Sequence, residues 1–169
     1  GSARGEVGMD LSTQATVGEL AGIDAGGAVE ISALTLLDDV WAAANGTVGS
    51  MLANGEVELS GQADLETLAT IGLDAAVAAG GDAMVQARSE VTGLDVQALG
   101  GGGGLAGAGG AWAEFNFSTL KTEVLVAGFS ELIAEGDVQL TATSIIDQTA
   151  LVSQDLGGLA VGTTVQAEV

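Results

Sequence analysis

The chain has 169 residues, of which 47% are hydrophobic but only 3% aromatic, so a core must be built mainly from Ala, Val and Leu. Three basic residues against 23 acidic ones give a formal net charge of −20, which makes nucleic acid and anionic membrane surfaces poor partners because both attract basic patches. Cysteine and proline are absent while glycine occurs 28 times, and a mean hydropathy of +0.46 argues against a disordered chain.

The first half of the chain repeats one short pattern. A weak copy begins at Gly5, and clear copies of the frame Ala-x-Gly-x-apolar-x-apolar-x-small occupy residues 25–33 and 53–61. Apolar and polar residues alternate within each copy, as in Val-Glu-Ile-Ser at 29–32. This period of two predicts half-buried β-strands with an acidic outer face.

Two features between these copies allow other local structures. Asn45-Gly46 and Asn54-Gly55 are dipeptides typical of turns. Residues 36–44 and 64–79 place apolar side chains near helical spacing, so one or two short helices stay open.

The second half continues the pattern. Clear copies occupy residues 79–87 and 134–142, and a weak copy begins at Gly109. Residues 96–113 are free of charge but contain eight glycines, which is unlike a membrane-spanning helix. Residues 161–169 again alternate and predict a last strand.

The spacing of the copies predicts the fold. The anchor glycines Gly5, Gly27, Gly55, Gly81, Gly109 and Gly136 are separated by 22, 28, 26, 28 and 27 residues. Repeats of this period are typical of solenoids, in which small side chains stack closely. We therefore expect an all-β fold, a parallel β-helix (β-solenoid) of about six coils of roughly 27 residues. It would form a single repetitive domain over 1–169, or a fragment of a longer array.

The repeats also resemble a known family. Ala-Gly-Gly-Asp-x-x-Val-x-Ala at 79–87 and Glu-Gly-Asp-Val-x-Leu-Thr-Ala at 135–142 are similar to repeats of filamentous-haemagglutinin-like and leukotoxin-type bacterial exoproteins. The Gly/Ala run at 100–110 resembles the small-residue stretches between those repeats, and the likeness covers most of 22–143. The resemblance implies a parallel β-helix, export to the cell surface, and adhesion, biofilm or fibre formation. A tandem-repeat protein that assembles into extracellular filaments is a related interpretation.

Catalytic chemistry is poorly supported by the residue types. The chain has no His and no Cys, which removes the commonest general base and the strongest nucleophile. Asp38-Asp39 is the one adjacent acidic pair, and a solvated turn explains it. We expect no enzyme, with a β-helical polysaccharide-active enzyme as an alternative.

Calcium is the one cofactor that the residues suggest. Stacked anchor glycines would bring Glu56, Asp82 and Asp137 into one row, and carboxylate oxygens can bind Ca²⁺. Because EF-hand and nonapeptide Ca²⁺ motifs are absent, we favour a hydrated acidic face over a metal site.

Contacts with partners are expected at three residues. Trp112 falls on the outer phase, opposite Ala111 and Ala113, and is an exposed contact candidate. Val165 and Val169 belong to the last strand, which could be lent to a neighbouring subunit.

Glycan attachment has two candidate positions. Asn45-Gly46-Thr47 and Asn116-Phe117-Ser118 are glycosylation sequons.

These observations favour a secreted structural or adhesive protein, the non-catalytic subunit of a surface fibre or coat. Its partners would be other copies of itself, with surface glycans as further ligands and no insertion into membranes. A Ca²⁺- or glycan-binding repeat module is the alternative.

Overall fold

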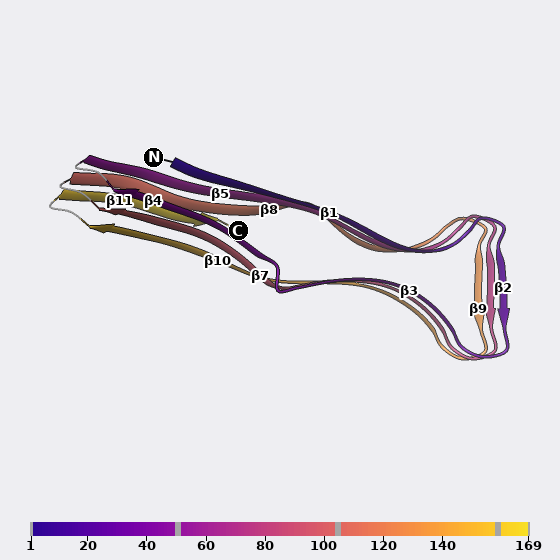
Figure 1. Ribbon diagram of the computed structural model, residues 1–169. Helices are drawn as coiled ribbons and strands as arrows, with labels where there is room; N and C mark the ends of the chain where they lie inside the picture. Colours follow the sequence, from indigo (N-terminus) through magenta and orange to yellow (C-terminus); the bar gives the residue numbers. More distant parts are fainter. Residues whose placement is uncertain (1, 50–51, 104–105, 158–159, 169) are drawn as a thin grey trace.

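The computed structural model describes residues 2–49, 52–103, 106–157 and 160–168, and every regular element in these ranges is a strand (Figure 1). The strands are β1 (Ser2–Val17), β2 (Gly22–Ala25), β3 (Val29–Asp38), β4 (Trp41–Gly49), β5 (Leu52–Ile71), β6 (Ala76–Ala79), β7 (Ala83–Gly103), β8 (Ala106–Val126), β9 (Glu131–Ala134), β10 (Val138–Gly157) and β11 (Ala160–Glu168). The all-β prediction is confirmed. The helical alternative is wrong, because residues 36–44 and 64–79 form parts of β3, β4, β5 and β6 with short turns between them and contain no helix.

The strands form three parallel sheets. The outgoing sheet has the order β1-β5-β8-β11, the end sheet has the order β2-β6-β9, and the return sheet contains β10-β7-β3 with β4 also paired to β7. Figure 1 shows the outgoing and return sheets facing each other, with the short end sheet joining them at one side. The chain therefore follows the same path several times, each passage lying beside the previous one.

Paired positions in neighbouring strands are separated by 54 residues, as for Asp38 and Thr92, or by 55, as for Glu66 and Lys121. Ser2 lies opposite Glu56 in the outgoing sheet, and Ala83 lies opposite Val138 in the return sheet. The predicted period, about six coils of roughly 27 residues, is therefore wrong, since one passage is about twice as long. We call residues 2–49, 52–103 and 106–157 units 1, 2 and 3; residues 160–168 begin a fourth.

The anchor glycines divide between two places instead of forming one stack. Gly55 lies opposite Gly109 in the outgoing sheet, whereas Gly5 lies opposite Leu59. Gly27, Gly81 and Gly136 lie in the bends that precede the return strands. Unit 2 contains one long strand in each facing sheet, β5 and β7. One copy of the sequence frame lies at the start of each, so each unit contains two copies.

The two Asn-Gly dipeptides lie inside strands and not in turns. Asn45-Gly46 belongs to β4 and Asn54-Gly55 belongs to β5. At Gly46 the need is steric, because an added Cβ would lie 2.7 Å from Val57 Cγ2 and 3.2 Å from Ala3 Cβ. The glycine lets the two facing sheets approach closely.

The core is thin and lies between the facing sheets. One buried cluster joins β4, β5, β7 and β8 and includes Leu59, Leu65 and Phe115. The other lies near the end sheet and includes Ile71, Val77 and Val85. Unit 2 has neighbours on both sides, so its inward side chains are the most completely buried.

A ladder of hydroxyl groups crosses the interior between these clusters. Thr35 Oγ1 donates to Thr13 Oγ1 at 2.8 Å and is hydrogen-bonded to Thr67 Oγ1 at 2.7 Å. Thr67 is bonded to Ser89 Oγ at 2.7 Å, and Thr122 Oγ1 donates to that oxygen at 2.9 Å. The ladder alternates between outgoing and return strands, so each buried hydroxyl is satisfied by the facing sheet.

The turns repeat in register even where no glycine is present. Leu20, Asp74 and Phe129 have φ of 57°, 54° and 58° and follow the outgoing strands of successive units. In the return sheet, Asp39 (φ 54°) lies beside Gly93 (φ 65°), and Asp39 N donates to Thr92 O at 3.2 Å.

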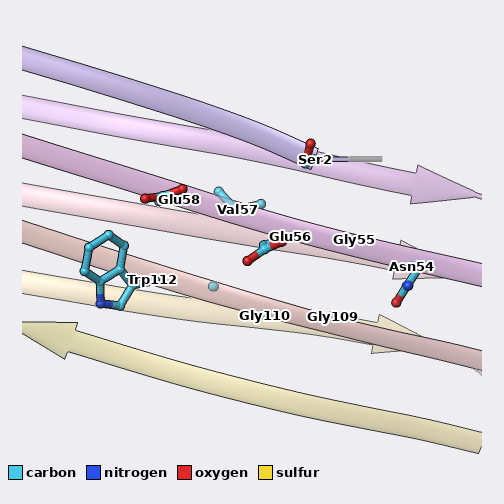
Figure 2. A pocket seen from close by; sticks show the side chains of 10 residues that line it. Ser2, Asn54, Gly55, Glu56, Val57, Glu58, Gly109, Gly110 and Trp112 are labelled. Carbon is cyan, nitrogen blue, oxygen red and sulfur yellow. The ribbon is translucent and has the colours of Figure 1, made fainter.

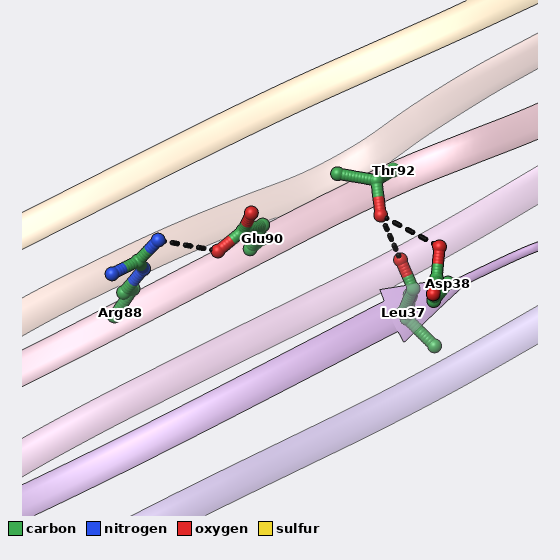
Figure 3. A network of polar contacts seen from close by, with 5 residues as sticks. All are labelled: Leu37, Asp38, Arg88, Glu90 and Thr92. Atoms are coloured by element: carbon green, nitrogen blue, oxygen red, sulfur yellow. Dashed lines mark hydrogen bonds and ion pairs between the residues drawn. The ribbon is translucent and has the colours of Figure 1, made fainter.

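Asp38 and Asp39 lie at this second turn, and both are exposed. Thr92 Oγ1 donates to Asp38 Oδ1 at 3.0 Å, and Figure 3 shows this contact near the Arg88–Glu90 ion pair. Asp38 and Asp39 therefore lie at a solvent-exposed turn, which is the interpretation that the sequence favoured.

Gly61 provides a test of the close sheet packing. A Cβ on Gly61 would lie 2.6 Å from Phe115 Cε2 and closer still to Cδ2 of the same ring, which is fully buried. Gly61→Ala should lower the free energy of unfolding by about 1–3 kcal/mol, because that ring has no free space to move into. Gly8→Ala is the matched control: its Cβ would meet nothing within 4 Å, and stability should be unchanged or rise by up to about 1 kcal/mol. Denaturant unfolding followed by circular dichroism measures both.

The hydroxyl ladder can be tested at Thr67. Thr67→Val keeps the volume but removes the partner that Thr35 and Ser89 share, and should cost about 1–3 kcal/mol. Thr67→Ser keeps the hydroxyl and loses one methyl group, at about 1 kcal/mol. Chemical unfolding of both variants compares the two effects. A valine variant at least as stable as the serine variant would contradict a stabilising ladder.

Candidate functional site

Unit 3 leaves inward-facing side chains open to solvent. Val85 of unit 2 is 1% exposed, whereas its neighbour in register, Leu140 of β10, is 52% exposed. Ala83 and Val138 show the same contrast, at 1% and 50%. In the described residues, β10 is paired on one side only, with β7, and β11 pairs with β8 only as far as Glu114.

The exposed large apolar side chains of unit 3 lie within one continuous segment of the sequence. We call residues 117–146, from the second part of β8 through β9 to β10, the third-unit edge. Its exposed large hydrophobic residues are Leu120, Leu125, Val126, Phe129, Ile133, Val138, Leu140 and Ile145. A parallel sheet edge with uncovered apolar side chains is a surface for adding another strand.

The opposite end of the stack is better covered. Ile31 and Ala33 of β3 are buried, since the β1 and β5 strands flank them in the facing sheet. The exposed apolar residues of unit 1 point outward or lie in turns: Leu20, Leu34, Leu36 and Trp41. The two ends of the described structure therefore differ in chemistry.

Trp112 lies on the outer face of β8, as predicted, and is half-buried, while Ala111 and Ala113 are buried. It borders a hollow of about 870 Å³ that also contacts Glu56, Glu58 and Gly110. Figure 2 shows the indole ring on β8 and the two carboxylates on the neighbouring strand β5. Gly110 lacks a side chain, and this opens the sheet surface beside the ring.

A second hollow of about 520 Å³ follows on the same sheet. Its lining includes the polar residues Ser60, Gln62, Glu114 and Asn116 together with Val7. Hydroxyl, amide and carboxylate groups thus continue along the outer face from Trp112. Such a surface offers both hydrogen-bond donors and acceptors.

The predicted row of calcium ligands is not assembled. Glu56 lies opposite Gly110 in the outgoing sheet, while Asp82 and Asp137 lie in bends before the return strands. Asp137 N donates to Asp82 Oδ1 at 3.0 Å, so these two are neighbours. Glu56 does not join that row, because one passage of the chain is about twice as long as the spacing of the anchor glycines. Calcium binding itself stays a prediction. Within the described ranges, no group of three or more acidic side chains could hold a metal ion.

The last strand pairs within its own chain. Val165 lies opposite Ala111 in the β11–β8 pair, and its role as a contact between subunits stays a prediction. Val169 lies outside the described residues.

Both sequon asparagines are exposed. Asn45 lies in β4, and Asn116 of β8 donates to the Glu114 carboxylate. Their use for glycans stays a prediction.

The few basic side chains are all engaged with carboxylates. Arg4 contacts Glu6 at 3.0 Å and Glu58 at 3.8 Å, and Lys121 contacts Glu123 at 3.0 Å and Glu66 at 3.3 Å. Hydrogen bonds to Glu123 and then to Glu66 raise the pKa of Lys121. Arg88 pairs with Glu90. With 23 acidic residues in the chain, most carboxylates have no basic partner.

Comparison with known proteins adds no relative: no family model, curated protein or solved structure matches the chain. In the described part of the chain, no helix is long and apolar enough to cross a membrane. The functional interpretation therefore depends on the geometry of the third-unit edge and of the outer hollows.

Sequence reasoning missed the third-unit edge and the hydroxyl ladder. A signal was present, because Thr13, Thr67 and Thr122 recur in one register column of β1, β5 and β8. The shorter frame obscured this longer period, since it recurs in both facing sheets.

Proposed function

We propose that this chain is a non-catalytic structural and adhesive protein of the extracellular space, and a subunit of a surface fibre or coat. In this proposal it is a parallel β-solenoid in which one coil spans 54 or 55 residues. The observation that carries the proposal is the exposure of inward-facing apolar side chains on the third-unit edge.

Edge exposure favours assembly for a simple reason. In a stack of equivalent units, each unit buries its apolar face only against its neighbours, and an end without a polar cap remains attractive. Covering Leu140 and Val138 to the extent of their unit-2 equivalents would remove substantial apolar area from water, at about 25 cal/mol per Å². Backbone groups along the same edge would gain parallel strand partners.

The charge of the chain suits a saline exterior. A formal charge of −20 makes approaching copies repel one another. Added salt shortens the range of this repulsion to about 8 Å near 0.15 M. Apolar edge contacts then dominate over the repulsion.

Fibre formation should depend on Leu140. In Leu140→Asp the free subunit should fold, since the side chain is half exposed, but a fibre would bury an unpaired carboxylate. We expect the critical concentration for assembly to rise at least about 100-fold, equivalent to about 2.7 kcal/mol. Electron microscopy and sedimentation, with NaCl raised from about 0.05 M to about 0.5 M, measure it.

The matched control is Thr141→Asp, which adds the same charge to an outward position of the same strand, in the register column that contains Gln86 and Ser32 and no carboxylate. It should shift the critical concentration only slightly. Single short particles of the unmodified chain at every protein and salt concentration would contradict the proposal.

Saccharide binding is a second candidate function, favoured by the hollow at Trp112. A flat aromatic ring beside hydrogen-bond acceptors is the usual composition of a small-molecule site. Glu56 and Glu58 would accept hydrogen bonds from hydroxyl groups and would disfavour anionic sugars. The polar hollow that follows could hold further sugar units of a neutral or amine-bearing chain.

This second function should depend on Trp112. Trp112→Ala should weaken binding of a neutral hexasaccharide, or of its amine-bearing counterpart, at least about tenfold, which is about 1.4 kcal/mol. Trp41→Ala, which removes an exposed indole from the return sheet, should leave affinity unchanged. Titration calorimetry with both hexasaccharides measures the affinity of each variant. Equal losses of affinity in Trp112→Ala and Trp41→Ala would argue against a binding site at Trp112.

A further inference from the structure

We propose that the third-unit edge is covered by residues 7–17 of β1 from a second copy of this chain, stacked head to tail in the register used within the chain. The inference rests on the proposed fibre function and names its contact. Four observations support it: where β11 ends, the two ends of the hydroxyl ladder, the pairing of exposed apolar residues, and the charges that would face each other.

The first observation is the length of edge left open. β11 covers β8 only as far as Glu114. Within the chain, the part of β1 from Val7 to Val17 lies opposite Gly61–Ile71, and this part of β5 in turn lies opposite Phe115–Val126 of β8. A second copy placed as the next unit therefore brings its residues 7–17 to the uncovered stretch.

The second observation is that the hydroxyl ladder runs from Thr13 to Thr122 and that Ser144 occupies the next position in its register column. Ser144 occupies the same register position as Ser89 and is exposed. Ser89 is bonded to Thr122, in the outgoing strand of the next unit. In the head-to-tail stack, Thr13 of the second copy takes the place that Thr122 has beside Ser89. Ser144 would then lie between Thr122 of the first copy and Thr13 of the second, as Ser89 lies between Thr67 and Thr122.

The third observation concerns the most exposed apolar residues. Phe129 is 90% exposed and Leu20 is 80% exposed. Both occupy the left-handed position of the same turn, in units 3 and 1. Stacking places Leu20 of the second copy beside Phe129 of the first. By the same register, Leu36 of the second copy lies beside Ile145, so exposed residues of the two ends cover one another.

The fourth observation is that the facing outer columns are compatible in charge. Within the chain, Asp10 lies opposite Asp64, a like-charge pair. At the junction, Asp10 of the second copy would face Thr119, which is the neighbour of Asp64 in β8. Ser12 would face Lys121, the neighbour of Glu66. This part of the junction places no carboxylates directly opposite, where they would destabilise the pairing.

The register makes two segments compete for one part of the β8 edge. Residues 2–6 of the second copy and residues 164–168 of the first would require the same part of the β8 edge. Residues 2–6 are also paired to their own β5 on the other side, whereas β11 is the last strand of its sheet. Residues 164–168 therefore leave β8 when the copies join.

The register can be tested by crosslinking, because the chain has no cysteine. Thr13→Cys and Ser144→Cys together should form a disulfide between copies in assembled material, giving a ladder of covalent oligomers on a non-reducing gel. Ladder oxygens within the chain are 2.7–2.9 Å apart, a separation that sulfur atoms can close. Within one chain, residues 13 and 144 belong to opposite end units, so only a second copy can bring them together.

Two further cysteine pairs serve as a positive and a negative control. Thr67→Cys with Ser89→Cys should give a disulfide inside one chain, since these oxygens are bonded at 2.7 Å. Ser12→Cys with Ser144→Cys should give no link, because Ser12 is exposed on the outer face of β1. Fibres that form without the 13–144 link, or that link 12–144 equally well, would overturn the register while leaving the fibre function intact. Failure to form fibres would overturn both.

Hydrogen exchange on the unmodified chain gives an independent measurement. On assembly, amides at 117–126 should gain protection of at least about tenfold, and those at 164–168 should lose it. Gain of protection at both segments would contradict the displacement, and the proposed register with it.

Discussion

The structure depends on one constraint: each strand is paired in parallel with the equivalent strand of the neighbouring unit. Like positions of successive units therefore form columns, and every column must suit its place in the stack. Thr13, Thr67 and Thr122 share an interior column, and Thr35, Ser89 and Ser144 share the facing one. Outer columns are less constrained, as Arg4, Glu58 and Trp112 share one.

The thin core makes neighbouring units essential to each other. Alanine and glycine allow the facing sheets to approach closely, but each small side chain contributes little buried area. Unit 2, which has neighbours on both sides, buries more of its inward residues than units 1 and 3 do. Stability in such a stack is a sum over contacts between neighbouring units. The end units are therefore the least stable, and they expose the surfaces that can bind a further unit. The chemistry for assembly is therefore found in inward-facing residues of the last unit and not in a pocket.

The sequence was informative about faces and uninformative about the period. Alternation correctly placed Val29 and Ile31 inward, and it placed Trp112 outward beside buried Ala111 and Ala113. The same alternation after a small residue occurs in outgoing and return strands, so a local frame cannot reveal which sheet a segment enters. The short predicted period and the row of carboxylates were both consequences of treating the two kinds of strand as one.

Other features carried no local signal. Gly46 looks like a turn residue beside Asn45, but packing against Val57 explains it, and that contact depends on how the sheets face each other. The left-handed turns at Leu20 and Phe129 contain no glycine at that position. Such turns are imposed by the strands on either side, so only the assembled stack reveals them.

A hydroxyl ladder inside so thin a core is best understood as a device that selects the register. The flanking apolar columns are alike, so sliding one strand by two positions would still match Ala, Val or Leu with similar partners. The same slide would move Thr67 away from Thr35 and Ser89, although its side chain is fully buried. Each buried hydroxyl left without a partner costs about 1–3 kcal/mol. The apolar columns therefore supply most of the attraction between units, and the hydroxyl groups determine which alignment is stable.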